Sequence, residues 1–514
     1  MLVAAGILLS RAAGFVRMRV FAHYFGLRSD AADAFNASFR IPNFLQALFG
    51  EGALSASFIP VYASLVTRGR RAEADRVAGA IGAIVSAIVA VVVLLGVLAA
   101  PAMVAIIAPG FSGEKRELTV TLTRILFPGA GLLVLAAWCL GVLNSHHKFL
   151  LSYAVGVVWN AAMIATLLVF GSGTPLPRLT VYLAWGSVLG SFLQIAAQVP
   201  VVLRVAPDLR FTFDLASDHV RTVGRNFVPV LVSRGVVQMS GYIDALLASL
   251  LPTGAVTGIS NAQSLYTLPV SLFGMSVAAS ELPAMSGDAV LDESATGPLR
   301  SRLDDGLRRI AFFVVPSAVA FLVFGDVVAG AVLQTGRFTS TDAVYVWKIL
   351  AGSSIGLVAS TLGRLYSTTL FALRDTKTPL RIAIVRVSLT TVLGYLFAIP
   401  LPRVLGVDAG WGAAGLTASA GVAGWVEMLL LRRALRTRVA SQGIPTLHLV
   451  RLWGSAFGAA AVGWGVRVLL PPLHPIVEGA LVLGPYGLAY VGATLALGVP
   501  EATTAMQRLR RVRS

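Results

Sequence analysis

The chain has 514 residues, of which 56% are hydrophobic and 13% charged, with a formal net charge of +17. Soluble domains carry about 25% charged residues, so the composition excludes an ordinary soluble protein and indicates many membrane-spanning segments. The positive charge lies in short loops between apolar stretches, which suits a cytoplasmic membrane surface better than nucleic acid. The single cysteine, Cys139, excludes an internal disulfide, and the sequence contains no Cys/His spacing typical of a metal site.

Fourteen stretches are candidates for spanning helices, since crossing a bilayer takes about 20 mostly apolar residues. They lie near residues 2–26, 31–66, 78–108, 119–143, 149–171, 180–204, 224–251, 255–285, 307–334, 342–372, 379–400, 410–431, 446–470 and 476–499. The second, eighth and tenth contain proline, glycine or charge, and we expect them to be bent or broken. Longer loops are expected at 205–223 and 286–306.

The loops alternate in charge. Arginines and lysines cluster in one set of loops, and the other set holds only Arg28, Lys115, Arg116, Arg178, Arg337 and Arg403. The positive-inside rule therefore predicts that the rich loops and both termini are cytoplasmic.

The sequence contains an internal repeat. Ser10-Arg11 recurs as Ser233-Arg234, Leu48-Phe49-Gly50 as Leu272-Phe273-Gly274, and Pro42 as Pro269. Six predicted spans separate the copies, so the repeat predicts two six-helix lobes of the same orientation with a site between them.

The predicted fold class is an all-α polytopic membrane protein with about 14 transmembrane helices. Two six-helix lobes surround a central cavity, and two C-terminal helices are added to them. The predicted domains are an N-lobe (1–205), a cytoplasmic linker (206–223), a C-lobe (224–440), and the last two spans with a basic cytoplasmic tail (441–514).

Charges inside the first spans must face protein or water, because each costs about 2.5–3.5 kcal/mol or more at the bilayer centre. Arg11 and Arg17, six residues apart on one half of the first helix, are candidates to bind phosphate. Snorkelling to the interface or ion pairing within a lobe is the alternative.

The second span carries further candidates. Asp33 could pair with an arginine and separate from it during gating, or it could cap the helix from Ala34 onward. Pro42 invites a kink beside Arg40, and Asn43 could satisfy the freed carbonyls or contact ligand. Glu51 could take part in a proton-linked step or in a static ion pair. We group Asp33, Arg40 and Glu51 as gating or ion-pair residues.

In the second half, the intramembrane charges considered are Arg234, Asp244 and Glu281, with Arg364 as a further cavity candidate. Arg234 and Arg364 are assigned to substrate binding, and Asp244 and Glu281 to gating or ion pairing. Lys377, assigned to the same group, lies in a cytoplasmic turn that could contact anionic head groups or be an ordinary charged turn.

The sequence contains no Walker motif, nucleophile elbow or zinc-type histidine spacing, so it favours a transporter over an enzyme. No cofactor or metal is expected. A coupling ion or the membrane potential would supply the driving force.

Several motifs resemble one family: SRAAGFVR at 10–17, DAF at 33–35, FRIPNFL at 39–45, EGALSASFIPVY at 51–62 and DTKTP at 375–379. They are similar to those of the MurJ/MviN lipid II flippases, in the multidrug/oligosaccharidyl-lipid/polysaccharide (MOP) exporter superfamily. The resemblance implies two lobes around a cationic cavity and translocation of undecaprenyl-pyrophosphate-linked peptidoglycan precursor by alternating access.

The resemblance also implies functional roles for Arg11, Arg17, Asp33, Asn43, Glu51 and Lys377. The family usually has an arginine at the position of Gln46, which we count as a substrate-binding candidate. It usually has an arginine and a glutamate where this chain has Ser264 and Thr267, so Arg234 or Arg364 would have to compensate.

The sequence therefore predicts a lipid II flippase of the bacterial cytoplasmic membrane. Its expected partners are lipid II or a related polyprenyl-pyrophosphate glycolipid, membrane lipids and cell-wall synthesis proteins, with no nucleic acid. The alternatives are a flippase for another polyprenyl-linked glycan, a cation-coupled drug exporter, and a non-transporting scaffold of cell-wall assembly.

Overall fold

The computed structural model describes residues 2–214, 216–291, 296–439, 443–504 and 507. The first half contains the helices α1 (Leu2–Phe25), α2 (Asp30–Leu45), η1 (Gln46–Leu54), α3 (Ser55–Thr67), α4 (Arg71–Ile107), α5 (Gly113–Ser145), α6 (Phe149–Phe170), α7 (Leu176–Val205) and α8 (Asp218–Ser249). The second half contains α9 (Ala255–Pro269), η2 (Val270–Met275), α10 (Ser276–Leu291), α11 (Thr296–Leu333), α12 (Ser340–Ala372), α13 (Lys377–Ala398), α14 (Pro400–Val404), α15 (Trp411–Val439), α16 (Thr446–Leu469) and α17 (Pro475–Ala496). The elements η1 and η2 are π-helical.

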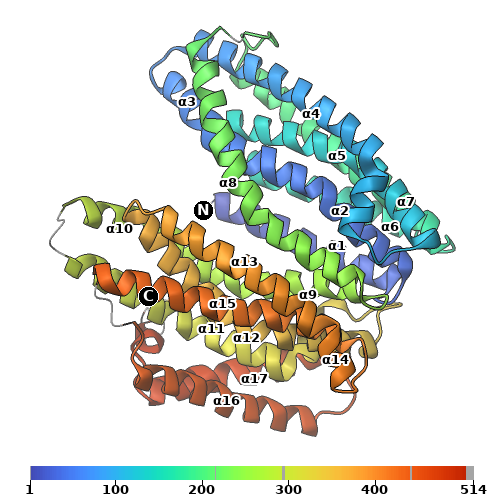
Figure 1. Ribbon diagram of the computed structural model, residues 1–514, viewed down its shortest axis with the longest axis vertical. Coiled ribbons are helices and arrows are strands. Elements are labelled where there is room, and N and C mark those ends of the chain that lie inside the picture. Colours follow the sequence, from blue (N-terminus) through green and yellow to red (C-terminus); the bar gives the residue numbers. More distant parts are fainter. Residues whose placement is uncertain (1, 215, 292–295, 440–442, 505–506, 508–514) are drawn as a thin grey trace. The chain divides into compact units, whose positions relative to one another are not determined.

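The helices form two compact units (Figure 1). Unit 1 is Met1–Thr257 with Thr335–Phe338, and unit 2 is Gly258–Gln334 with Thr339–Ser514. The predicted lobe boundaries were drawn from the sequence repeat and not from compactness, so they stay a prediction.

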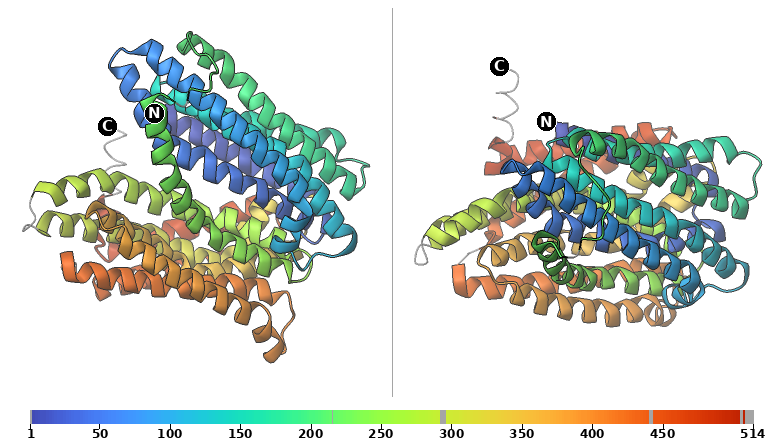
Figure 2. Two further views of the ribbon diagram at one scale, coloured as in Figure 1. Left: turned by 45° about the horizontal axis from the view of Figure 1, so that its top comes forward. Right: turned by 90° about the horizontal axis from the view of Figure 1, so that it is seen from above.

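In unit 1, α5 packs against α2, α4 and α7, and α1 packs along α6. The long helices α4 and α5, blue and cyan in Figure 2, run side by side. Helix α8 packs against α3, η1 and α4. These contacts place α2 and α8, which carry several of the predicted site residues, in the same unit.

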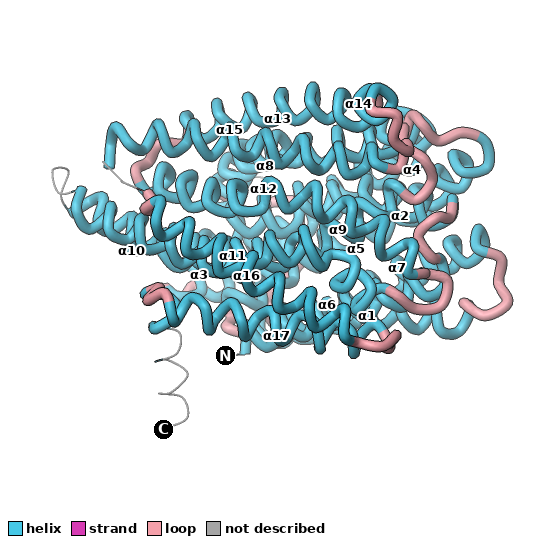
Figure 3. Tube along the Cα trace, turned by 90° about the horizontal axis from the view of Figure 1, so that it is seen from below, coloured by secondary structure: helices cyan, strands magenta, loops and turns pink. Residues whose placement is uncertain are grey.

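In unit 2, α12 packs against α11 and α15, and α13 lies along α15 (Figure 3). Helices α16 and α17 pair with each other and pack on α11. Arg467 of α16 joins this arrangement through Asp326 of α11, with Nη2 2.6 Å from Oδ2. The charge of Arg467, near the end of an apolar helix, is thereby neutralised within the unit.

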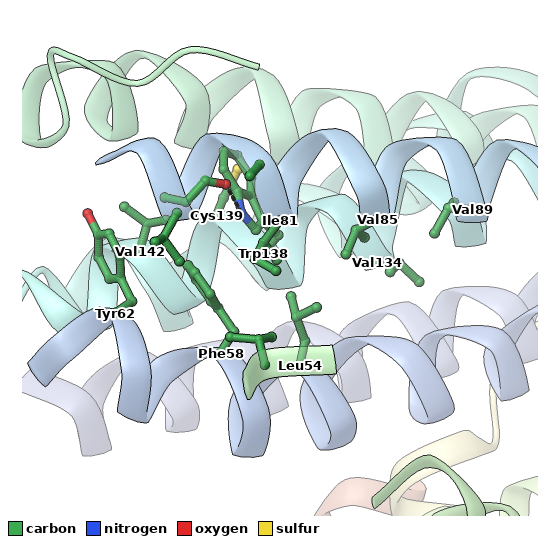
Figure 4. Packing of buried hydrophobic residues seen from close by; sticks show 14 of the residues in the cluster. Leu54, Phe58, Tyr62, Ile81, Val85, Val89, Val134, Trp138, Cys139 and Val142 are labelled. Atoms are coloured by element: carbon green, nitrogen blue, oxygen red, sulfur yellow. Dashed lines mark hydrogen bonds between the residues drawn. The ribbon is translucent and has the colours of Figure 1, made fainter. Parts of the chain in front are cut away.

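An apolar cluster of unit 1 joins α3, α4 and α5 (Figure 4). Phe58 and Tyr62 pack near Trp138, whose indole N–H donates to the carbonyl of Ala78 at 3.2 Å. Cys139 is buried in the same cluster. Lipid tails are as apolar as these side chains, so close packing, and not transfer from water, stabilises such a cluster in a membrane.

The proline-containing second and eighth stretches are interrupted, as predicted. Pro42 lies in α2 just before η1, and Pro269 ends α9 just before η2. The repeated Leu-Phe-Gly lies in the π-helical segment in both cases. The two copies therefore share a local backbone geometry as well as a sequence, since proline and π-bulges are common causes of helix kinks.

The tenth stretch, expected to be bent or broken, is not broken: α12 is one continuous helix, and a capping box between Thr339 and Asp342 fixes its start. The prediction for another stretch is wrong. The loop expected at 286–306 is largely helical, because α10 continues to Leu291 and α11 begins at Thr296. The 205–223 stretch contains a non-helical segment, and α8 begins at Asp218.

Nine helices within the described ranges are long and apolar enough to cross a membrane, and Ser55–Thr67 and Val155–Phe170 are shorter apolar helices. In lipid the backbone must satisfy its own hydrogen bonds, which explains why such stretches are helical. The chain is a multi-pass membrane protein. The number of fourteen spans stays a prediction.

The contact between α12 and α15 depends on two glycines and gives a first prediction. A Cβ on Gly421 would lie 2.8 Å from the backbone nitrogen of Gly356, whereas a Cβ on Gly424 would meet nothing within 4 Å. We expect Gly421→Ala to lower the thermal unfolding temperature of the purified protein, because overpacking costs about 1–3 kcal/mol. The matched control Gly424→Ala should leave it unchanged or raise it slightly, since alanine is the better helix former by about 1 kcal/mol. Equal unfolding temperatures for both variants would contradict the close approach.

Candidate functional site

Asp33, near the start of α2, is buried, with 1% of its surface exposed. Its Oδ1 accepts hydrogen bonds from the backbone N–H (2.9 Å) and the hydroxyl (2.7 Å) of Thr257. Its Oδ2 accepts from the backbone N–H of Gly254 at 2.8 Å and from Lys115 Nζ at 3.0 Å. Four donors and one positive charge therefore compensate the buried carboxylate, as its desolvation requires.

The turn before α9 has a backbone conformation that lets the N–H groups of Gly254 and Thr257 reach Asp33. Gly254 has φ of +99°, a conformation that side chains of L-residues rarely adopt. The neighbouring Thr253 hydroxyl donates to Asp30 Oδ1 at 2.8 Å, and Lys115 also pairs with Asp30 at 3.0 Å. The network thus joins the start of α2, the first turn of α5 and the 253–257 segment, all within unit 1.

The partner of Asp33 differs from both sequence-based expectations. Asp33 pairs with Lys115 and not with an arginine, because its side chain meets the first turn of α5. Nor does Asp33 cap the helix: Ser29 has the extended backbone of an N-cap, and its hydroxyl accepts from the N–H of Ala32 at 3.2 Å. A role for Asp33 in gating stays a prediction.

Arg17 of α1 is held by α6. Its Nε donates to Asn160 Oδ1 at 2.8 Å, and its guanidinium carbon lies 5.1 Å from the centroid of the Trp159 ring. The amide of Asn160 is itself oriented, since Nδ2 donates to the carbonyl of Gly156 at 2.9 Å. Among the described residues, Arg17 has no ion pair, and only its Nε makes a hydrogen bond. Two terminal nitrogens can therefore bind an anion.

Arg40 of α2 lies against α8. Its Nη1 donates to the carbonyl of Gly241 at 3.4 Å, and the Tyr242 hydroxyl donates to the carbonyl of Arg40 at 3.4 Å. The carboxylate of Asp244 is close enough to stabilise the charge of Arg40. The structure thus brings together two of the predicted gating residues, Arg40 and Asp244.

The other candidates of the first repeat are more scattered. Arg11 is exposed on α1, and Asn43 and Gln46 are half-buried at the junction of α2 and η1. The side chains of Glu51 and Arg234 lie outside the part of the structure that is described.

Two candidates of unit 2 lie in different settings, Lys377 beside a turn and Glu281 within a helix. Lys377 is exposed at the start of α13, and the preceding turn is held by Asp375, which accepts from the N–H groups of Lys377 (3.1 Å) and Thr378 (3.0 Å). The Thr378 hydroxyl first, and then the Arg438 guanidinium at 2.9 Å, lower the pKa of Asp375. Glu281 of α10 lies 3.7 Å from Arg302 of α11.

Sequence reasoning missed two groups. In the sequence analysis Lys115 was counted only as a loop charge. In the structure its Nζ lies 4.3 Å from the centroid of the Phe111 ring, so Lys115 is a partly buried cation. The ion pair of Arg386 and Glu427 was overlooked too. Both residues interrupt apolar stretches, which is the signal that identified the other intramembrane charges.

Comparison with known proteins assigns the family. A family model described as "Lipid II flippase MurJ" matches residues 21–477. The chain belongs to this family. It is 32% identical over 462 residues to "Lipid II flippase MurJ" of Burkholderia cenocepacia, covering 88% of this chain and 86% of that protein. It is 29% identical over 487 residues to "Probable lipid II flippase MurJ" of Rhizobium meliloti, covering 92% and 88%.

Solved structures agree on the fold of the family. "Lipid II flippase MurJ, inward closed conformation" matches with a TM-score of 0.78 at 21% identity, covering 96% of this chain and 99% of that one. An inward-facing multidrug resistance MATE family transporter of the MOP superfamily matches with a TM-score of 0.68 at 17% identity, covering 84% and 96%. At these identities the likeness concerns the fold alone.

The Asp33 network gives a second prediction. Asp33→Asn removes the charge that balances Lys115, and losing one partner of a buried ion pair costs about 3–5 kcal/mol. We expect faster amide hydrogen exchange in the 253–257 segment of the purified protein, measured by mass spectrometry. Asp30→Asn is the matched control, because the Asp30 side chain is 63% exposed and its loss leaves the Asp33–Lys115 pair in place. Unchanged exchange in Asp33→Asn would contradict the role of this network in holding the turn.

Proposed function

We propose that this protein is a flippase that moves lipid II, the undecaprenyl-pyrophosphate-linked peptidoglycan precursor, from the inner to the outer leaflet of the bacterial cytoplasmic membrane. The observation that carries the proposal is the family match over residues 21–477, supported by relatives of the same printed name across most of the chain. The family is one of transporters and not of catalysts, so no reaction is assigned to this chain.

Arg17 is the residue best placed to bind the diphosphate. Its guanidinium is oriented by Asn160 and stacked on Trp159, and its terminal nitrogens can contact phosphate oxygens in a fork geometry. Arg11, one and two-thirds turns earlier on the same helix, would add a second cation. The prenyl tail stays in lipid throughout, because moving it through water would expose its apolar surface.

Release on the outer side requires a change of conformation. In the proposed cycle two lobes rock about the bound head group, and the electrostatic interaction of Arg40 with Asp244 changes as they do. The membrane potential or an ion gradient would reset the cycle, since each charge moved is worth about 2.3 kcal/mol per 100 mV. The cycle needs no cofactor.

We further propose that both termini are cytoplasmic, on the basis of the arginine-rich loops. Cell-wall synthesis proteins are the proposed protein partners, since they would consume the translocated precursor.

A second candidate function is the transport of another polyprenyl-linked glycan. Gln46, Ser264 and Thr267, where the family usually carries charged residues, favour it as the alternative to lipid II.

The third prediction concerns Arg17. Losing a charge-assisted hydrogen bond costs about 1.5–3 kcal/mol, so we expect Arg17→Ala to slow lipid II translocation in proteoliposomes by about tenfold or more. Arg11→Ala should slow it as well. Arg178→Ala, which removes an exposed arginine at the start of α7, is the charge-matched control and should translocate at the wild-type rate.

The same variants can be compared in a bacterium depleted of its own flippase. Full rescue of growth by both Arg11→Ala and Arg17→Ala would remove the anion-binding role of these arginines. Failure of the wild-type protein to translocate lipid II in liposomes would refute the proposed function itself.

A further inference from the structure

Unit 2 contains an intramembrane ion pair outside the site described above. Arg386 of α13 donates from Nη1 to Glu427 Oε2 of α15 at 2.8 Å. Arg386 lies nine residues into α13, or about 13 Å along the helix from its cytoplasmic start, which is near the middle of a span. The side chain of Arg386 is 37% exposed and that of Glu427 is 15% exposed.

A second arginine and two hydroxyls lie on the neighbouring helices α9 and α12. Tyr266 of α9 shares a hydrogen bond of 2.7 Å with the hydroxyl of Ser360 of α12. Arg364, one turn after Ser360, and Arg386 are both close enough to act electrostatically on the Tyr266 hydroxyl. Four helices of one unit thus contribute to a single polar cluster.

The exposure of these arginines indicates that they face water. Arg364 is an exposed residue of the spanning helix α12. A charged side chain pointing into lipid at this depth would cost about 2.5–3.5 kcal/mol or more. A water-filled space or a polar ligand is the environment that avoids this cost.

The charges of the cluster do not cancel. Glu427 compensates Arg386, but Arg364 makes no ion pair or hydrogen bond with any residue that the structure describes. The cluster of Arg364, Arg386 and Glu427 therefore carries one net positive charge. Both guanidinium groups keep N–H donors that can bind phosphate oxygens, whereas the Ser360 hydroxyl donates to the carbonyl of Leu357 and the Tyr266 hydroxyl can donate to Ser360.

We propose that Arg364 and Arg386 form an oxyanion site in unit 2 that binds the diphosphate of a prenyl-linked substrate, with Glu427 as its modulator. Glu427 orients the Arg386 guanidinium while the site is empty. Its negative charge also weakens anion binding, which favours release, and a transporter has to release its substrate on every cycle. The identity of the substrate rests on the proposed function, whereas the anion site rests on the geometry of unit 2.

The experiment compares the two partners of the ion pair. Binding of farnesyl diphosphate to the purified full-length protein in nanodiscs is measured by microscale thermophoresis, with farnesol as the uncharged comparison and inorganic diphosphate as the lipid-free one. We expect Arg364→Gln and Arg386→Gln each to raise the Kd for farnesyl diphosphate by about tenfold. Glu427→Gln should lower that Kd several-fold, because it raises the charge of the cluster.

The opposite directions of the Kd changes in Arg386→Gln and Glu427→Gln distinguish an anion site from a purely structural ion pair. A structural pair predicts that Arg386→Gln and Glu427→Gln both lower the unfolding temperature and change the Kd in the same direction, and that result would overturn the proposal. The double variant Arg386→Gln/Glu427→Gln removes both partners of the ion pair and leaves neither charge without the other, so it should fold stably and still bind weakly. Arg403→Gln, an exposed arginine of α14, is the control for net charge and should bind like the wild type.

Failure of this site and failure of the proposed function give different results. If the variants show the expected pattern with farnesyl diphosphate but the wild-type protein does not translocate lipid II, the site stands and the proposed function falls. If the wild-type protein translocates lipid II and the Kd for farnesyl diphosphate is the same in all variants, the site falls and the function stands. Equal wild-type affinity for farnesol and farnesyl diphosphate would also overturn the site.

Discussion

A charge inside a lipid bilayer has to be compensated by the protein or by water that the protein admits. This constraint governs the placement of Asp33, Arg17 and Arg386. The backbone can satisfy itself by forming helices, but a carboxylate or a guanidinium needs partners from other helices. Charged residues supply some of the polar contacts between helices, and uncharged ones supply others, such as the Tyr486 hydroxyl that donates to the carbonyl of Pro316. The apolar remainder packs by shape.

The charged groups fall into two kinds according to how completely they are compensated. Asp33 is closed: both carboxylate oxygens accept two hydrogen bonds each, and Lys115 balances the charge. Arg17 is open, because its contacts with Asn160 and Trp159 orient the guanidinium without neutralising it. A fully compensated network is suited to holding segments of the protein together. A charged group without a counter-charge is suited to binding a ligand of opposite charge. The same distinction separates the Arg467–Asp326 contact, which joins α16 to α11, from the partly compensated cluster at Arg364.

The helical class and the interrupted second and eighth stretches could be predicted from sequence, because apolar length and proline act locally. The partners of the charged residues could not. Asp33 was expected either to pair with an arginine or to cap its helix. It meets Lys115 instead, which lies 82 positions later and reaches it only through the packing of α5 on α2. The Arg386–Glu427 pair joins residues 41 positions apart on neighbouring helices. Sequence indicates that a buried charge needs a partner, but which partner it meets depends on which helices are neighbours.

The repeat adds a further constraint on how the two halves can work. Each half contains a proline followed by a π-helical Leu-Phe-Gly segment, so each has a point where the hydrogen-bond ladder of a spanning helix is locally changed. In the first half, Gln46 begins this segment, and Arg40 lies about one and two-thirds turns before it. In the second half, Tyr266 lies just before the corresponding segment and belongs to the Arg364–Arg386 cluster. A charged or polar residue thus lies within two turns of the π-helical segment in both halves. Because π-helical segments are frequent at functional sites, this shared placement is consistent with a role of both segments in the work of the protein.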